Sequence, residues 1–152
     1  MTEIKIHCFG IYRKWVRLLN EQIKEHLQKV KNEIVTSLES TFPNILVFED
    51  EVPEEETKKY DDGAPYHLFV LKMGAFQKQA NSKYLTQTFT VDYYSENRDD
   101  VDETTLDVIA VLTVVRTVSF ADSDKFRARH ANTNRFIDIV TMDFTRMTKF
   151  GC

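Results

Sequence analysis

The chain has 152 residues, of which 42% are hydrophobic and 29% are charged, and its formal net charge is −4. This length and composition predict a single globular domain over residues 1–152 that needs neither a metal nor a disulfide to stay folded. Because its 24 acidic residues outnumber its 20 basic ones, a general phosphate-binding surface is disfavoured, and with it nucleic acid as the main partner.

The ends of the chain argue against secretion and membrane insertion. The N-terminal stretch MTEIKIHCFG lacks the long apolar segment of a signal peptide, and no run of about 18 apolar residues occurs anywhere. The two cysteines, Cys8 and Cys152, are interpreted as reduced thiols, since a terminal cysteine is a poor disulfide partner.

A long amphipathic helix is predicted from Ile11 to about Thr41. Pro43 disfavours helix at Phe42, so the helix should end just before it. At 1.5 Å per residue its roughly 30 residues span about 45 Å. Only one stripe is apolar, so the helix is expected to cover a sheet. The stripe consists of Trp15, Leu19, Ile23, Leu27, Val30, Ile34 and Leu38.

The middle of the chain reads as strands separated by loops. Residues 45–48 form a short strand candidate, and the acidic segment 49–63 is interpreted as a loop. Residues 66–73 and 84–94 are predicted to be strands that pair as a hairpin across a turn at 74–82.

The second of these strands alternates between apolar and polar residues, which is typical of a half-buried antiparallel strand. Its polar face should meet solvent or a partner. That face carries Thr86, Thr88, Thr90 and Asp92, opposite Leu85, Phe89, Val91 and Tyr93.

A second helix is predicted from about Val101 to Thr117, because Asp100 followed by Glu103 resembles a capping box. The β-branched run 108–115 also fits a buried strand, although the cap and the length favour helix. The inner stripe of this helix is expected to be Leu106, Ile109, Ala110 and Thr113.

The last third is predicted to be strands. Residues 118–120 form a short strand and 122–124 a turn. Residues 126–131 and 135–148 form a hairpin around Asn132-Thr133-Asn134. The order of helix, strands, helix, strands predicts the α+β class, with a mainly antiparallel sheet packed by the long N-terminal helix and the second helix.

No catalytic or metal-binding constellation stands out. The acidic segment lacks the ligand spacing of a calcium loop, and no two histidines have the i, i+4 spacing of a zinc site. His7 and Cys8 are adjacent, so on an extended segment they would point to opposite faces. No phosphate-binding loop or nucleophile elbow occurs. We therefore expect no cofactor, no metal and no enzymatic activity.

One weak enzymatic alternative is a two-metal nuclease. Asp92, Glu96 and Asp99 could supply its carboxylates, but no acidic-x-Lys pattern lies on a neighbouring strand. Cleavage of plasmid DNA that requires magnesium and is lost in Asp92→Ala would identify it.

Separated blocks of opposite charge instead favour a subunit that assembles. An acidic patch on one copy could meet a basic patch on the next. The acidic residues chosen for this contact are Glu49, Glu51, Glu54 and Glu55, and the basic ones are Arg127, Arg129 and Arg135.

The order of these features resembles the tail-terminator (tail-completion, or tail-to-head joining) proteins of bacteriophages. The resemblance rests on FPNILVFEDEVPE after the long helix, APYHLFVLKMG, YLTQTFTVDYYSENRDD and the closing RFIDIVTMDFTRM, and it covers nearly the whole chain. It implies an α+β fold and no catalytic residues.

The resemblance also implies a function. Such proteins form a hexameric ring on the head-proximal end of the tail tube, end its polymerisation and dock the head–tail connector. The expected partners are thus further copies of the chain, the tail tube protein and the connector protein, with no membrane and with DNA only passing through the lumen. The protein would reside in the tail-neck region of the virion after assembly in the bacterial cytoplasm. Thr86, Thr88 and Thr90 would face the lumen or the tube. The alternative is another connector or neck-adaptor subunit.

Overall fold

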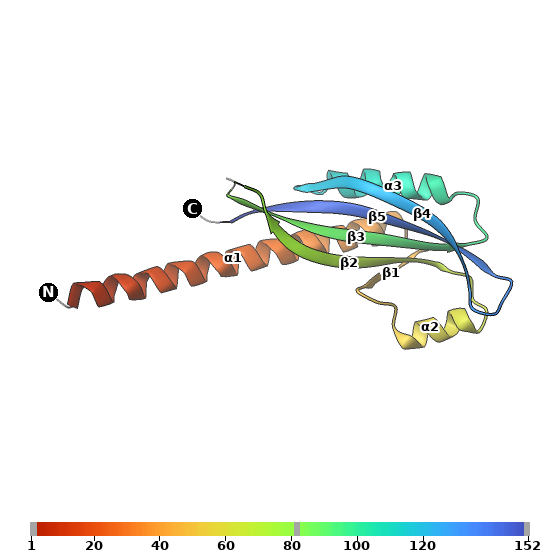
Figure 1. Ribbon diagram of the computed structural model, residues 1–152, viewed down its shortest axis with the longest axis horizontal. Helices are drawn as coiled ribbons and strands as arrows, with labels where there is room; N and C mark the ends of the chain where they lie inside the picture. The colour runs from red at the N-terminus through yellow and green to blue at the C-terminus, as the bar shows by residue number, and fades with distance from the viewer. Residues whose placement is uncertain (1–2, 81–82, 151–152) are drawn as a thin grey trace.

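The computed structural model describes the backbone of residues 3–80 and 83–150, and within those ranges the side chains from residue 13 onward. This part of the chain forms helices and strands in the order that defines an α+β protein, which confirms the predicted class (Figure 1). The elements are α1 (Glu3–Thr41), β1 (Leu46–Glu49), α2 (Glu54–Asp61), β2 (His67–Lys78), β3 (Tyr84–Glu96), α3 (Val101–Val114), β4 (Val118–Arg129) and β5 (Phe136–Lys149).

The strands form one five-stranded sheet in the order β1-β2-β3-β5-β4. Strand β1 runs parallel to β2, and every other neighbouring pair is antiparallel. Both predicted hairpins, β2–β3 and β4–β5, are therefore confirmed. In the β4–β5 turn Asn132 has a left-handed φ of 49°, a conformation that asparagine tolerates better than most residues.

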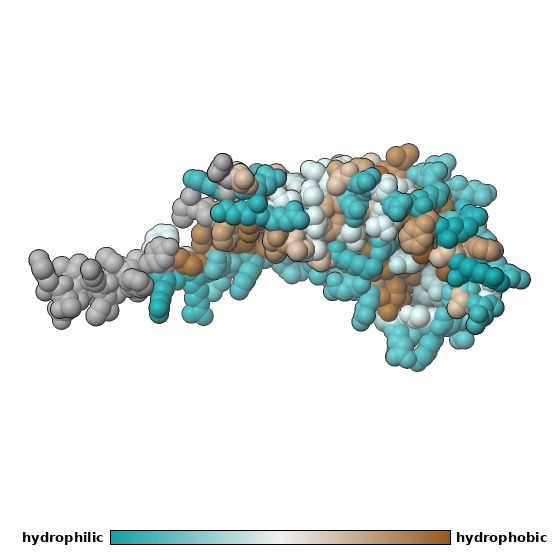
Figure 2. All heavy atoms as spheres, in the orientation of Figure 1, coloured by the Kyte–Doolittle hydropathy of each residue, from teal (hydrophilic) through white to brown (hydrophobic). Residues whose placement is uncertain are grey.

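Helix α1 is longer than predicted: it begins at Glu3, and its 39 residues span about 58 Å. Its C-terminal part packs on the sheet through Val30, Ile34 and Leu38. Its N-terminal part extends past the end of the sheet (Figure 1). Where this part carries described side chains, hydrophobic residues face the body of the molecule and hydrophilic ones face away (Figure 2).

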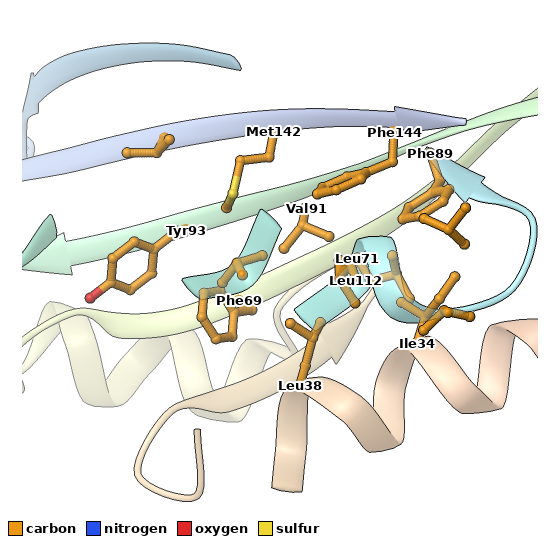
Figure 3. Packing of buried hydrophobic residues seen from close by; sticks show 14 of the residues in the cluster. Ile34, Leu38, Phe69, Leu71, Phe89, Val91, Tyr93, Leu112, Met142 and Phe144 are labelled. Carbon is orange, nitrogen blue, oxygen red and sulfur yellow. The ribbon is translucent and has the colours of Figure 1, made fainter. Parts of the chain in front are cut away.

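The main core lies between one face of the sheet and the helices α1 and α3. Ile34 and Leu38 of α1 meet Leu112 of α3 over Phe69 and Val91 (Figure 3), and the exposed fraction of each of these side chains is zero. Strand β5 contributes every second residue to this face, as the pairing of Phe144 with Phe89 and of Met142 with Val91 shows.

A smaller core lies on the opposite face of the sheet, beneath α2. Tyr60 of α2 packs on Leu68 and Val70 of β2. The prediction that 49–63 is a loop was therefore wrong over Glu54–Asp61. The high density of charged residues in this segment led to the loop prediction. These charges are nevertheless arranged in the way that stabilises a helix, with acidic residues in the first turn and lysines in the last turn.

The choice of helix for the second helical segment was correct. Of its predicted inner stripe, Ile109 is partly buried against the main core, but the prediction was wrong for Leu106, Ala110 and Thr113, which are exposed. The buried residues of α3 are Val101, Thr104, Val108 and Leu112, whereas Leu106 is 66% exposed. Nearly every turn of this helix is apolar on several sides. Its own sequence therefore did not determine which side faces the sheet.

Two segments that were predicted to be turns, residues 74–78 and 122–124, are continuous strand instead. β2 runs on through Gly74 to Lys78 because a β-bulge between Met73 and Phe76 keeps it paired with β3. Likewise, β4 passes through 122–124 with an irregularity after Phe120, because it stays paired with β5 along its length.

Candidate interaction surfaces

The four acidic residues proposed for a subunit contact lie along the end of β1 and the start of α2. Glu49 forms an ion pair with Lys31 of α1, and Glu54 pairs with Lys58 one helical turn later at 3.1 Å. Glu51 and Glu55 are exposed. Two of the four are thus already neutralised within the chain, which leaves less unpaired charge for a neighbour than the sequence indicated.

The three arginines on the other side of that predicted contact also have partners in their own chain. Arg127 and Arg129 lie on the same face of β4, as predicted, since they pair in register with Asp138 and Phe136. The Arg127 guanidinium donates to both Asp138 carboxylate oxygens at 2.7 and 3.0 Å, and this contact lowers the pKa of Asp138. Arg129 donates to the β4–β5 turn.

Arg135 fastens three segments together. Its Nε and Nη2 donate to the two Glu96 oxygens at 2.8 and 2.7 Å. Its Nη1 donates to the carbonyl of Tyr60 at 2.7 Å, and Nη2 also donates to that of Ala64 at 2.6 Å. The guanidinium lies 5.8 Å from the centre of the Tyr66 ring. Arg135 therefore ties α2 and the loop after it to the ends of β3 and β5.

A polar pocket of about 500 Å³ opens beside this contact, at the end of the sheet. Each arginine that lines it is paired with a carboxylate: Arg98 with Asp100, Arg127 with Asp138 and Arg135 with Glu96. An anionic ligand would have to compete with these carboxylates. The paired side chains that line the pocket are thus better suited to holding the surrounding segments together than to binding phosphate.

The threonine face lies on the side of the sheet opposite the main core, as predicted. Thr86, Thr88 and Thr90 are half-buried rather than fully exposed, because the neighbouring strands partly cover them: Thr88 pairs in register with Thr145 and Thr90 with Asp143. They lie outside the cluster beneath α2.

The three carboxylates considered for a nuclease do not form a cluster among the described residues. Asp92 accepts hydrogen bonds from Lys72 Nζ at 2.8 Å and from Thr141 Oγ1 at 2.7 Å. Glu96 is held by Arg135, and Asp99 lies in the loop at the polar pocket. Among the described residues, no three His, Cys, Asp or Glu side chains come together as a metal site.

The remaining titratable candidates have local roles. His67 lies 3.2 Å from the Tyr93 hydroxyl, and burial lowers the pKa of His67. His130 lies 3.1 Å from an Asp61 oxygen. The side chains of His7 and Cys8, and the residue Cys152, lie outside the described part of the chain. Within that part, no helix combines the length and the apolar character needed to cross a bilayer.

The sequence analysis did not single out the projecting part of α1 as a surface. We call residues 13–27 the arm. Trp15 is 70% exposed, Leu18 49% and Val16 40%, while Leu19 and Ile23 are half-buried. The arm continues the apolar stripe that is buried farther along α1. Its last residue contacts the sheet, because the Leu27 carbonyl accepts a hydrogen bond from Arg146 of β5 at 2.8 Å. The exposed residues Trp15, Val16 and Leu18 near its start form an apolar surface that the sheet does not cover.

A second uncovered apolar surface lies on α3. Leu106 is 66% exposed and Val114 84%, and the two lie on one helix face because they are separated by two i, i+4 steps through Ala110. Val111, Val114 and Val115 also line one side of a groove of about 750 Å³ between α3 and α1. Polar residues of α1, among them Glu33 and Ser37, line its other side.

A scan against protein-family models finds no family that matches this chain, and a search of curated proteins finds no similar sequence. What the chain does must therefore be inferred from its residues and their arrangement.

Proposed function

We propose that this protein is a structural subunit of a bacteriophage tail, a terminator that forms a ring on the head-proximal end of the tail tube. The ring ends polymerisation of the tube and presents the docking surface for the head–tail connector. In this proposal the protein has no catalytic step; its work is done by surfaces that bind other copies, the tube and the connector.

The observation that supports the proposal is the order of elements. The long amphipathic helix, the short strand before the acidic segment, the two central strands, the second helix and the closing strands occur in the order on which the resemblance to tail terminators rests. The two uncovered apolar surfaces, on the arm and on α3, add support because a subunit that stays alone has no need of them.

Partners can be assigned to surfaces within this proposal. The half-buried face of Thr86, Thr88 and Thr90 is uncharged at those positions, which suits contact with the tube or the lining of a lumen through which DNA slides. The polar end of the sheet, where Arg135 anchors the segment after α2, offers a fixed surface to a second structural protein.

The test is deletion of this reading frame in the phage that produces it, followed by electron microscopy of the lysate. We expect over-long or ragged tails together with unattached filled heads, and restoration of normal particles when the wild-type protein is supplied from a plasmid. Normal tails and normal infectivity would refute the proposal. Tails of normal length that fail to join heads would instead favour a connector or neck-adaptor subunit.

A further inference from the structure

The arm and the exposed face of α3 each carry apolar residues with a four-residue repeat, and their net charges are opposite. We infer that the arm of one copy binds α3 and the adjoining groove of a second copy. This inference rests on the self-assembly part of the proposed function, and it names the surfaces that join neighbouring subunits. It differs from the pairing of acidic and basic patches that the sequence indicated.

The two apolar surfaces are of the same length and periodicity. The arm has 15 residues and α3 has 14, so each spans about 21–23 Å. Trp15, Leu19 and Ile23 repeat every four residues on the arm, and the row on α3 repeats in the same way. Rows of this spacing interdigitate in the commonest class of helix packing. The small side chain of Ala110 at the centre of the α3 row allows a close approach.

The groove beside α3 offers a place for the largest side chain of the arm. Trp15 is the only tryptophan of the chain, and most of its surface is exposed. The groove has a volume of about 750 Å³ and an apolar wall formed by Val111, Val114 and Val115. Aromatic side chains that enter such hollows commonly contribute most of the energy of an interface.

Charge favours this pairing over contact between two arms or between two α3 helices. The arm carries four basic and two acidic residues, for a net charge of +2. Helix α3 carries three acidic residues and no basic one, for a net charge of −3. Asp102 already pairs with Lys125, which leaves Glu103 and Asp107 exposed beside the apolar row to face the basic residues of the arm.

The contact cannot be made within one chain. Helix α1 already packs against α3 of its own chain through its C-terminal part. Glu25, near the end of the arm, lines the groove between the two helices, whereas the N-terminal part of α1 extends away from that contact, past the end of the sheet (Figure 1). A contact that joins two different surfaces is heterologous, so each copy can give its arm to one neighbour and accept the arm of another. Repetition of such a contact produces a closed ring or an open filament.

The intrinsic fluorescence of Trp15 in the full-length protein gives the first test. On increasing protein concentration, the emission should shift to shorter wavelength as Trp15 leaves water. The shift should follow the rise in mass measured by sedimentation. Val114→Asp should abolish both changes, and because Val114 is 84% exposed this substitution should leave the fold intact, as circular dichroism would show.

Charge reversal then tests the pairing itself. One variant carries Glu103→Lys and Asp107→Lys on α3, and another carries Arg13→Glu and Arg17→Glu on the arm. Each variant alone should associate at least tenfold more weakly than wild type, equivalent to about 1.4 kcal/mol. An equimolar mixture of the two should regain association, because the acidic arm of one variant can bind the basic α3 of the other.

A matched control reverses the same number of charges elsewhere, through Glu51→Lys and Glu54→Lys near α2. It should associate like wild type. Equal weakening in this control would overturn the assignment to α3, as would failure of the mixture to recover or the absence of any concentration-dependent shift. If the emission of Trp15 shifts only when vesicles that contain anionic lipid are added, the arm binds membranes, and this result would also overturn the inference. The deletion phenotype is independent of all these results.

Discussion

Substitution of Glu96 by glutamine tests whether the contact with Arg135 holds the end of the sheet together. The Glu96 side chain is only 4% exposed and accepts three hydrogen bonds, two from Arg135 and one from the Tyr66 backbone N–H at 3.2 Å. Glutamine has nearly the same shape, so the substitution removes the charge and one acceptor oxygen while creating little space.

The expected magnitude follows from the donors that lose their acceptor. The amide retains one oxygen, and its NH₂ group must then face a donor of Arg135 or Tyr66. A hydrogen bond to a charged group contributes about 1.5–3 kcal/mol, so we expect the free energy of unfolding to fall by about 2 kcal/mol. For a domain of this size, that lowers Tm by about 4–8 °C.

The pH dependence gives a second signature. The hydrogen bonds from Arg135 hold the pKa of Glu96 below its ordinary value of 4.5, against the opposing effect of burial. A carboxyl whose pKa is lower in the folded state contributes stability that is complete above the unfolded pKa and is lost as the pH falls through the folded pKa. Glutamine does not titrate in this range. The difference in the free energy of unfolding between wild type and Glu96→Gln should therefore become smaller below about pH 4.5.

Urea unfolding monitored by circular dichroism at pH 7 and across the acidic range measures both effects. Glu39→Gln is the matched control, since Glu39 is exposed on the packed part of α1. If Glu96→Gln and the control differ by less than about 0.5 kcal/mol, the range of ordinary surface substitutions, the reasoning about this contact is wrong.

Two further predictions concern packing. Gly74→Ala should lower the free energy of unfolding by about 1–3 kcal/mol, because an added Cβ would lie 2.5 Å from Thr88 Oγ1 and 2.8 Å from the Thr88 carbonyl oxygen; a normal Tm would show that the bulge adjusts freely. Leu112→Ala should cost about 2–5 kcal/mol, whereas Leu106→Ala should change the stability of the monomer by less than about 0.5 kcal/mol. Denaturant unfolding in dilute solution compares the two, and the reverse order would mean that α3 faces the sheet with its other side.

Much of the fold could be predicted from the sequence because its signals are local. The apolar stripe of α1 repeats with the period of a helix, and the alternation in β3 has the period of a strand, so each segment indicates its own structure. The Asn-Thr-Asn turn between β4 and β5 likewise marks a hairpin. These patterns were enough to predict the α+β class.

The sequence could not show which of several apolar sides would be covered. On α3, the predicted stripe through Leu106 and the observed one through Leu112 have equally good helical spacing. Only packing against α1 and the sheet selects between them. The end of the sheet also determines where α1 loses its support, and therefore that Trp15, Val16 and Leu18 of the arm are exposed.

Partners far apart in the chain were decided by tertiary structure alone. Arg135 meets Glu96 across 39 residues and the carbonyl of Tyr60 across 75. No local pattern connects these positions, because the chain must first form the hairpins and place α2 on the sheet. The sequence by itself determined α1, α3, the main part of each strand and the distribution of charge, but it did not reveal α2. The tertiary structure determined which charges are paired within one copy, and which apolar surfaces remain for another.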